Sequence, residues 1–413
     1  AYTETTIDPA VIRKTARIMA KNAPHTLVHP GRFTTWYGDD TQRVRAGAIL
    51  NALLGNWGQK GGFFNPVKVD LPSYPHPAYP KPRKNWRDAF PEKYKLANLA
   101  LASGICEATI PSPERDCHIK SWIVYGTNLI KTFPNKKQTI EAIQKLELLV
   151  VVDILPTEIT GWADVILPEC SYLERYDELR VSQGKKAQIA LRMPAFKPLH
   201  NSKPAWWIAK KLSDKLGLSQ YLPWKNVEAY LDFRLKKIGS SLEEMKKKGV
   251  ITVKNEDSIY FSKDEAIEFD TDSGKIELYS DTLASAGFDP MPKYTKHAQP
   301  DPDFYRLLSG RTPMHSFSRT TNNPLLTQLY PENEVWINST VARQWDIKNG
   351  QRIKLKNQDN IISTPIRVKV TERIRQDAVY LVHGFGGEQK QLRRAYRKGA
   401  SDSILSTNVL YDQ

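Results

Sequence analysis

The sequence predicts an α/β protein in which a parallel-sheet region is followed by a smaller, closed β-domain. Between Ser121 and Glu169, apolar strand segments alternate with short polar loops and a helical segment, which is typical of parallel βαβ units. After about residue 300 the apolar period changes from roughly 3.6 to 2 residues, which indicates short strands. Turn signals at Asn349–Gly350 and at 358–360 separate these strands and favour a small closed sheet.

Two helices are expected before the sheet region, within a first domain at residues 1–64. The first spans residues 8–22, with Asp8 as N-cap and Pro9 in the first turn. The second begins near residue 41 and ends in a series of glycines at positions 55, 58, 61 and 62.

A proline-rich segment follows, within a second region at residues 65–120. Six prolines fall between Pro66 and Pro82, which excludes a helix or a central strand and predicts extended surface chain. The irregular stretch continues towards Cys117 and is too long for an ordinary connection. We therefore expect it to be functional or to face a partner.

The predicted α/β region covers residues 121–290, and the β-domain covers residues 300–413. Residues 204–217 form an amphipathic helix that Gly217 closes, and residues 225–250 are expected to form a further charged helix. The segment 291–303 is a plausible linker between the two regions.

Length and composition limit the size of the core and the classes of protein to which the chain can belong. A chain of 413 residues with 40% hydrophobic content can bury one large core or two to three smaller ones. No apolar run approaches the ~20 residues needed to cross a bilayer, so we expect no direct membrane insertion. The first ten residues show no basic-then-apolar signal pattern.

The formal net charge of +15 raises the question of nucleic acid binding. The basic residues are scattered along the chain, and the densest cluster, Lys246–Lys248, is typical of a solvated helix face. Tyr74 and Tyr79, near Lys81, are the only candidates for stacking on bases. We therefore expect no nucleic acid partner. A polyanionic cofactor or an acidic electron-transfer partner would suit the same charge.

The three cysteines, Cys106, Cys117 and Cys170, do not form a metal motif. The chain has no CxxC pair, and three thiolates cannot complete the four-cysteine shell of a cubane cluster. Buried or incidental thiols are the favoured interpretation, and a disulfide between Cys106 and Cys117 is the alternative.

Polar residues follow the predicted strands where a parallel sheet binds nucleotides. Gly126, Thr127 and Asn128 come after one strand, and a glycine there lets backbone amides approach a phosphate. Asp153 ends the next strand, where a carboxylate can accept from ribose hydroxyls. Asp164 could take the ring N–H and amino group of guanine in a two-bond fork. A strand cap or an ion pair is the alternative for Asp164.

The order of these motifs resembles the molybdopterin oxidoreductase (dimethyl sulfoxide reductase) family. A strand ending in Asp153, the pair Thr157–Glu158 and the run 163–168 (ADVILP) match the guanosine-binding loop of that family. Residues 309–316 match its pterin-contacting loop, and residues 383–386 match its later glycine turn. The segments GRFTTWYGDD, HSFSRTTNNPLL and LVHGFGG are most similar to the catalytic subunits of polysulfide and thiosulfate reductases. Respiratory arsenate reductases are the second choice.

The resemblance implies a parallel-sheet dinucleotide-binding region and a C-terminal closed β-barrel of the double-psi type. It further implies molybdenum, or tungsten, held by two molybdopterin guanine dinucleotides, and no metal ligand is expected in this chain. The family's [4Fe–4S] cysteines and its metal-binding residue lie upstream of the matched region, so this part alone should be inactive. The cofactor-binding residues that it implies are Gly126, Thr127, Asn128, Asp153, Thr157, Asp164, Gly310, Arg311, Thr312, His315, Ser316, His383 and Gly384.

The same resemblance implies a substrate and partners. The substrate would be a small sulfur anion, and electrons would arrive through a ferredoxin-like iron–sulfur subunit from a quinol-oxidising membrane anchor in anaerobic respiration. The location would be periplasmic or on the extracytoplasmic face. Arsenate or tetrathionate reduction is one alternative, and a cofactor-free scaffold that keeps the fold is another.

Two basic groups are candidates for roles beside the metal or the pyrophosphates. His29 and Arg32 are the predicted catalytic residues, because an arginine there would stabilise an anionic substrate. A salt bridge from Arg32 to Asp39 or Asp40 is the competing explanation. The basic run at helical spacing after the glycine turn is either a solvated face or a partner for the pyrophosphates; it comprises Lys390, Arg393, Arg394, Arg397 and Lys398.

Overall fold

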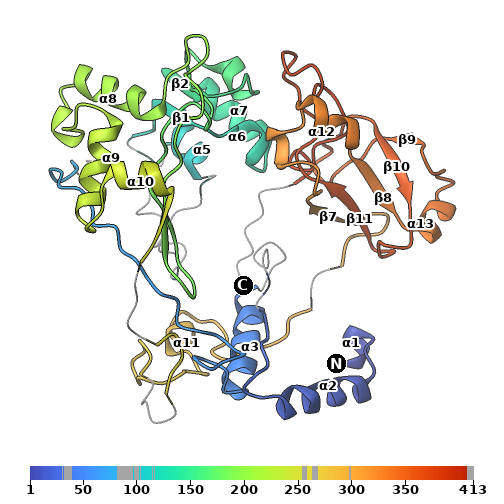
Figure 1. The fold of residues 1–413 in the computed structure, drawn as a ribbon. Helices are drawn as coiled ribbons and strands as arrows, with labels where there is room; N and C mark the ends of the chain where they lie inside the picture. Colours follow the sequence, from blue (N-terminus) through green and yellow to red (C-terminus); the bar gives the residue numbers. More distant parts are fainter. Residues whose placement is uncertain are drawn as a thin grey trace.

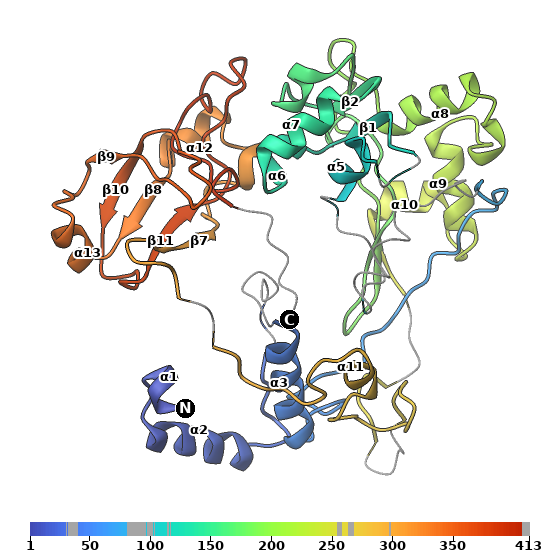
Figure 2. The same ribbon diagram turned by 180° about the vertical axis from the view of Figure 1, so that it is seen from behind.

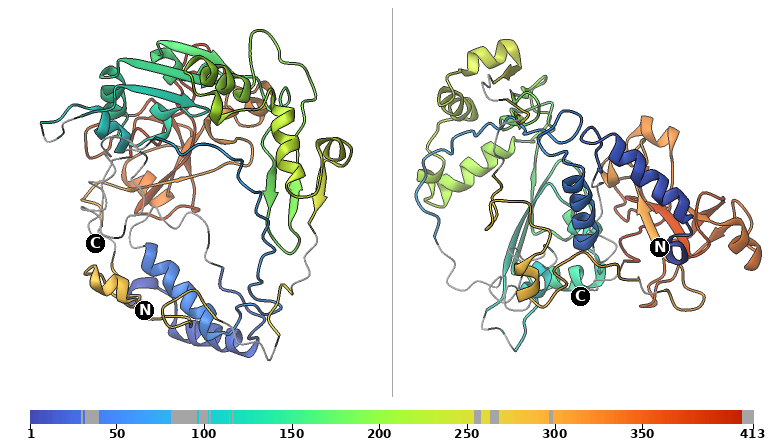
Figure 3. Two further views of the ribbon diagram at one scale, coloured as in Figure 1. Left: turned by 90° about the vertical axis from the view of Figure 1, so that its left-hand side faces the viewer. Right: turned by 90° about the horizontal axis from the view of Figure 1, so that it is seen from below.

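The computed structural model describes residues 1–29, 31, 40–80, 96, 102, 104–113, 115, 117–253, 258–262, 268–296 and 299–406 of the chain. Figures 1 and 2 show three bodies: an N-terminal helical body, an α/β lobe with a helical extension, and a C-terminal β lobe. The left view of Figure 3 shows the same separation of the N-terminal helices from the two lobes.

The N-terminal body is built from α2 (Pro9–Lys21), α3 (Asp40–Leu53) and α11 (Asp281–Ser285), with the short α1 (Tyr2–Thr5). As predicted, Asp8 caps α2, and its carboxylate accepts the Ala10 amide at 2.7 Å. The Arg45 guanidinium on α3 donates to the carbonyls of Leu278 at 3.1 Å and Pro290 at 2.7 Å. Residues near α11 therefore pack with the first helices, whereas we expected them in the α/β region.

The α/β lobe contains the predicted parallel sheet. Its strands, β1 (Ser121–Tyr125), β2 (Leu148–Asp153) and β3 (Val165–Pro168), pair in the order β1-β2-β3, all parallel. The connections include α6 (Leu129–Thr132), α7 (Lys136–Gln144) and the 3-10 helix η2 (Ile159–Trp162), and α5 (Gly104–Thr109) precedes the sheet. Trp122, Val124, Leu149 and Val151 on one face of the sheet are buried against these helices. The carboxyl ends of β1 and β2 therefore meet at one edge of the sheet.

A helical extension continues the α/β lobe. It holds the antiparallel strands β4 (Arg180–Ser182), β5 (Gln188–Ala190) and β6 (Val250–Thr252) beside α8 (Ala205–Lys215) and the 3-10 helix η3 (Ser219–Tyr221). The predicted helix at 225–250 is two helices, α9 (Val227–Lys236) and α10 (Leu242–Lys248). Gly239, with φ of 75°, lies in the break between them.

The proline-rich stretch packs on this extension. Tyr74 meets Trp224 edge-on at 5.1 Å between ring centroids, and Tyr79 stacks on Tyr221 at 5.3 Å. Both aromatic side chains therefore have intramolecular partners, which weighs against the base-stacking role considered above.

The C-terminal lobe is a five-stranded mixed sheet with the order β7-β11-β8-β10-β9. Its strands are β7 (Arg306–Gly310), β8 (Glu334–Ile337), β9 (Arg352–Ile353), β10 (Ile366–Val370) and β11 (Ala378–Val382), with η4 (Phe317–Arg319), α12 (Pro324–Leu329) and α13 (Ser339–Gln344) around them. The strand pairs among the described residues leave β7 and β9 at the edges. These pairs form an open sheet, and the closed barrel that we expected is not among them.

Two other predictions concern single features. Cys106, Cys117 and Cys170 are all free thiols, so the alternative of a disulfide between Cys106 and Cys117 is wrong. None of the helices in the described ranges is both long enough and apolar enough to span a bilayer.

Candidate functional site

The loop after β1 holds the first group of predicted residues. Gly126 has φ of 60°, and no atom lies within 4 Å of the position that a Cβ would take. Its amide donates to the Val152 carbonyl at 2.9 Å, which ties the loop to β2. The Asn128 Nδ2 group donates to Glu158 Oε2 at 2.5 Å. Its Oδ1 atom is buried and has no partner among the described residues. Thr127 lies half-buried between them.

The loop after β2 lies at the same edge of the sheet. Asp153 accepts the amides of Ile154 at 2.7 Å and Leu155 at 3.3 Å. Burial raises the pKa of this carboxyl, and the two amides only partly oppose the shift. The Thr157 hydroxyl oxygen is buried and, like Asn128 Oδ1, has no partner in the described part of the chain. Buried polar atoms are nearly always hydrogen-bonded, so two orphans beside an open glycine fit a polar ligand. We call residues 126–128 and 153–158 the β1–β2 loops.

Asp164 does not join this group. It precedes β3, and its carboxylate accepts the Leu149 amide at 2.7 Å at the start of β2. In the β2–β3 register, Asp153 lies opposite Pro168. Asp164 is therefore about four residues away along the strand, roughly 13 Å at 3.3 Å per residue. The structure gives Asp164 the alternative role that we considered, a cap at the opposite edge of the sheet.

The loop after β7 carries the second group of predicted residues. Gly310 has no room for a side chain, because a Cβ would lie 2.5 Å from the Tyr380 hydroxyl. The Arg311 guanidinium covers the Phe317 ring at 4.2 Å and is exposed. The Thr312 hydroxyl contacts the Met314 sulfur at 3.1 Å. Gly310 and Thr312 are half-buried, and Arg311 lies exposed between them.

His315 in this loop is buried and hydrogen-bonded within its own lobe. Its Nε2 atom lies 2.8 Å from the Tyr330 carbonyl, which can only accept, so Nε2 carries the proton. Its Nδ1 atom lies 3.3 Å from the Thr320 hydroxyl, which also accepts the Ser316 amide at 2.8 Å. Both ring nitrogens are occupied within the lobe. The predicted pterin contact of His315 is therefore not supported by this geometry, and Ser316 contributes a backbone bond.

The turn after β11 holds His383 and Gly384, and we call residues 383–387 the glycine turn. Gly384 has φ of 100°, and a Cβ there would lie 2.5 Å from the Phe317 backbone. His383 Nδ1 lies 2.8 Å from the Asp402 carboxylate, and the ring meets Phe317 edge-on at 5.4 Å. Burial alone would raise the pKa of Asp402. The hydrogen bond and charge of His383 act in the opposite direction, and the pKa is lowered overall. Asp402 thus orients His383, and sequence reasoning missed it.

The two groups of loops meet where the lobes touch. Figures 1 and 2 place α6 on the side of the α/β lobe that faces the β lobe. The Lys131 ammonium on α6 donates to the Phe385 carbonyl. Gln389 Nε2 donates to the Thr157 carbonyl at 3.0 Å. The β1–β2 loops and the glycine turn are therefore direct neighbours, although about 250 residues separate them in sequence.

His29, one of the two predicted catalytic residues, does not lie at this site. His29 is exposed, and its Nδ1 accepts the Gly31 amide at 2.9 Å. It lies in the connection between α2 and α3, in the separate N-terminal body (Figure 1). Arg32 and its alternative partner Asp39 lie outside the described residues, as does the side chain of Asp40.

The basic run after the glycine turn is not helical, contrary to its spacing. Residues 390–398 form turns, and Arg397 has φ of 52°. A helix needs continuous αR backbone, which a residue at positive φ interrupts. A solvated helix face is therefore excluded for this run.

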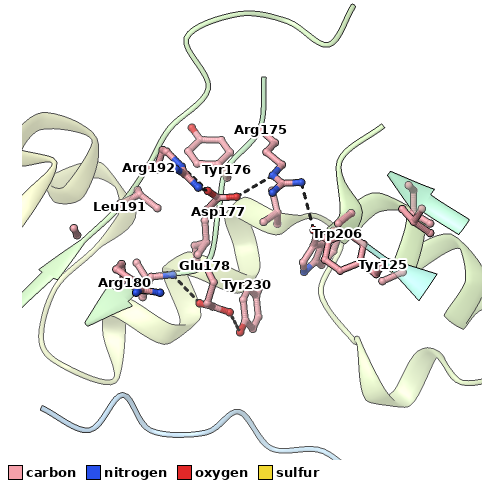
Figure 4. A pocket seen from close by; sticks show the side chains of 18 of the residues that line it. Tyr125, Arg175, Tyr176, Asp177, Glu178, Arg180, Leu191, Arg192, Trp206 and Tyr230 are labelled. Carbon is pink, nitrogen blue, oxygen red and sulfur yellow. Dashed lines mark hydrogen bonds and ion pairs between the residues drawn. The ribbon is translucent and has the colours of Figure 1, made fainter. Parts of the chain in front are cut away.

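A large hollow of about 1130 Å³ lies between the parallel sheet and the helical extension (Figure 4). Ile123 and Tyr125 of the sheet and Trp206 of α8 give it an apolar wall. Its acidic and basic side chains are largely paired with one another: Asp177 lies between Arg175 and Arg192 in Figure 4 and binds both. A mostly apolar wall with internally paired charges offers little to a polyanion, so we assign the candidate site to the loops.

The described residues contain no cluster of His, Cys, Asp or Glu side chains placed to hold a metal ion. The polar groups that the loops do offer are amides, hydroxyls, an arginine and an imidazole, which suit phosphate, ribose and pterin groups. Lys131, Glu158 and Asp402 were not among the predicted site residues. Glu158 stood in a quoted motif, but neither lysine nor aspartate follows a recognisable spacing.

Comparisons with known proteins agree with this arrangement. The sequence model of the molybdopterin oxidoreductase family matches residues 21–215, and that of the molydopterin dinucleotide binding domain matches residues 305–412. The thiosulfate reductase molybdopterin-containing subunit PhsA of Salmonella typhimurium is 28% identical, over 92% of this chain and 54% of that protein. Dimethyl sulfoxide reductase DmsA of Escherichia coli is 26% identical, over 88% of this chain and 48% of that protein.

A solved structure gives the same assignment at the level of the fold. Acetylene hydratase from Pelobacter acetylenicus superposes with a TM-score of 0.61 at 21% identity, covering 75% of this chain and 44% of that one. The chain spans about half the length of the curated relatives named above. Between them the two family models match α3, the parallel sheet as far as α8, and the C-terminal lobe. The chain therefore belongs to the molybdopterin oxidoreductase family.

Proposed function

We propose that this chain is the C-terminal part of a molybdenum or tungsten oxidoreductase that binds two molybdopterin guanine dinucleotides and reduces thiosulfate or polysulfide. The observation that carries the proposal is the meeting of two ligand-type loops from separate lobes. Asn128 Oδ1 and Thr157 Oγ1 are buried without partners in the described residues, beside the open Gly126. Arg311 and His383 present a cation and an imidazole from the other lobe.

The residues present suit one dinucleotide in each group of loops. The β1–β2 loops would hold a guanosine and its phosphates through Gly126, Asn128, Asp153 and Thr157. The β7 loop and the glycine turn would hold a pterin and the second dinucleotide, and closure of the lobe into the family's double-psi barrel belongs to the same proposal. When bound, the metal would supply the two-electron redox chemistry. This chain's own part is to bind, orient and shield the organic portion of the cofactor.

The choice of a sulfur substrate follows from the thiosulfate reductase subunit among the relatives. In this proposal a ferredoxin-like iron–sulfur subunit delivers electrons from a quinol-oxidising membrane anchor, on the extracytoplasmic side of the membrane. A [4Fe–4S] cluster would belong to the part of the enzyme that this chain does not span. His29 and Arg32 remain the proposed substrate contacts, and Arg32 is the more direct candidate because its charge matches an anionic substrate.

One experiment tests the cofactor and a second tests the substrate. The intact protein should contain molybdenum or tungsten and about two guanine nucleotides per metal, measured by metal analysis and by chromatography after acid release. The absence of both would favour a cofactor-free scaffold and refute the enzyme. Assays with reduced viologen should then show faster turnover of thiosulfate or polysulfide than of tetrathionate or arsenate. The reverse order would assign the chain to the alternative reductases.

A further inference from the structure

Glu158 holds both groups of loops with one carboxylate. Its Oε2 atom accepts Asn128 Nδ2 at 2.5 Å, on the side of the β1–β2 loops. Its Oε1 atom accepts the Glu388 amide at 2.8 Å, directly after the glycine turn. The two acceptors of one side chain therefore join chain segments that are 30 and 230 residues away in sequence. A carboxylate has a lone pair for each donor without needing a proton of its own.

Basic groups on α6 and α7 complete this contact. Lys131 is buried and donates to the Phe385 carbonyl, and Lys136 pairs with the Glu388 carboxylate. Burial alone would raise the pKa of Glu158. The Lys131 charge and the hydrogen bonds to Glu158 act in the opposite direction and outweigh burial, so the pKa is lowered overall and the side chain is a carboxylate. The groups enclose a cavity of only about 20 Å³, enough for roughly one water molecule.

The glycine turn is packed on two sides, which limits its movement. A Cβ on Gly386 would lie 2.5 Å from the Ser401 amide of the β lobe, so the backbone there is packed against its own lobe. A Cβ on Gly387 would lie 3.5 Å from Glu158 Oε1, so the other side of the segment meets the α/β lobe. The glycine turn therefore lies between Ser401 and Glu158, and His383 stands at its start.

We propose that Glu158 is a positioning residue, which sets the register between the β1–β2 loops and the glycine turn so that one bound cofactor meets Asn128 and His383 together. Lys131 balances the negative charge of Glu158 and donates a hydrogen bond to the glycine turn. This inference rests on the proposed function, because the register matters only if a ligand spans both lobes. Glu158 itself contacts neighbouring protein groups and acts through them.

The chemistry of the carboxylate supplies a sharp variant. A glutamine has one acceptor oxygen and one donor group, so with the Asn128 amide oriented as it is in the structure, Glu158→Gln can satisfy either Asn128 Nδ2 or the Glu388 amide but not both. Adding Asn128→Asp restores the lost bond with donor and acceptor exchanged, since the new carboxylate can accept from the glutamine amide. Glu141→Gln is the matched control, because Glu141 is an exposed carboxylate on α7 with no hydrogen-bond or ion-pair partner among the described residues.

Hydrogen exchange of the intact protein, followed by mass spectrometry, reads the register directly. We expect Glu158→Gln to speed exchange of residues 384–391 by about tenfold or more, since a bond to a charged acceptor holds them. Strand β10 at 366–370 should exchange as in the wild type. The double variant should return residues 384–391 towards the wild-type rate. Guanine content should fall in the Glu158→Gln variant, and Glu141→Gln should change neither measurement.

Contrary results are equally clear. Unchanged exchange at 384–391 in Glu158→Gln would overturn the inference, as would equal acceleration of β10, which would indicate a general loss of stability. If the double variant does not recover slower hydrogen exchange at residues 384–391, the Asn128 bond does not set the register. Faster exchange with unchanged guanine content would show that the contact is structural only. Wild-type protein without guanine would refute the proposed function instead, while the exchange data would still decide whether Glu158 holds the two loops.

Discussion

Replacing His315 with alanine tests whether this histidine stabilises the β lobe or binds the cofactor. The ring makes two hydrogen bonds, to the Tyr330 carbonyl and with the Thr320 hydroxyl. It also packs edge-on against Phe385 at 5.4 Å. Each hydrogen bond is worth about 1 kcal/mol, and the ring contact adds about 1 kcal/mol. We therefore expect the alanine variant to lose about 3 kcal/mol of unfolding free energy, within the range for buried polar networks.

Urea titration followed by tryptophan fluorescence measures this loss, because Trp336 lies in the same sheet, 5.0 Å from Tyr380. Arg311→Gln is the matched comparison from the same loop. Its guanidinium is exposed over Phe317, and losing that contact should cost at most about 1 kcal/mol. We expect Arg311→Gln to lower guanine content with little change in stability.

The opposite pattern would refute this assignment of roles. If His315→Ala unfolds within about 0.5 kcal/mol of the wild type, the range of neutral surface changes, and yet loses guanine, its ring contacts the ligand. The two buried hydrogen bonds would then have to be weak in solution. Ser316→Ala is the control within the loop, since only the Ser316 backbone amide is bonded to Thr320.

Three further predictions follow from single contacts. Gly310→Ala should destabilise the β lobe by about 1–3 kcal/mol through overpacking against the Tyr380 hydroxyl, and Tyr380→Phe should relieve part of the loss in a urea titration. Asp402 has a lowered pKa, so its stabilisation is present above the unfolded pKa of about 3.9 and is lost as pH falls through the folded value. The Asp402→Asn variant should therefore have a lower free energy of unfolding than the wild type at neutral pH, and this free energy should fall less as the pH is lowered. Urea midpoints measured across about pH 3–7 test both expectations. Asp153→Asn should lower guanine content, whereas Asp164→Asn should leave it unchanged, because the amide oxygen can still accept the backbone bond.

Local patterns predicted the elements of the fold well. The N-cap at Asp8, the parallel strands between residues 121 and 168 and the helix ended by Gly217 are all properties of neighbouring residues, and the structure confirms them. The charged helical stretch predicted at 225–250 is divided into two helices, because the backbone turns at Gly239. The position of residues 268–296 could not be predicted, since it depends on Arg45 reaching carbonyls about 240 residues away.

The sequence indicated where in the sheet some candidate site residues lie, but not which contacts they make. Gly126 and Asp153 were placed correctly at one sheet edge, because parallel strands bring their carboxyl ends together. Asp164 comes directly before β3, whereas Asp153 ends β2. Because β3 runs parallel to β2, the Asp164 carboxylate lies at the amino ends of these strands, opposite Asp153. His315 stood beside an exposed arginine in sequence, yet its neighbours in space are Tyr330 and Phe385. Sequence spacing does not distinguish these two environments.

The contacts that join the two lobes explain why neither group of loops revealed its function alone. Each group is a local feature: a glycine turn after a strand, with a few polar side chains. Turns of that kind occur in many α/β and β proteins, so each one by itself is weak support for a ligand. Glu158 and Lys131 are among the side chains that join them, and their partners lie 230 and 254 residues further along the chain. If a ligand needs both lobes, as we propose, its binding should depend on such contacts even where the side chains do not touch it.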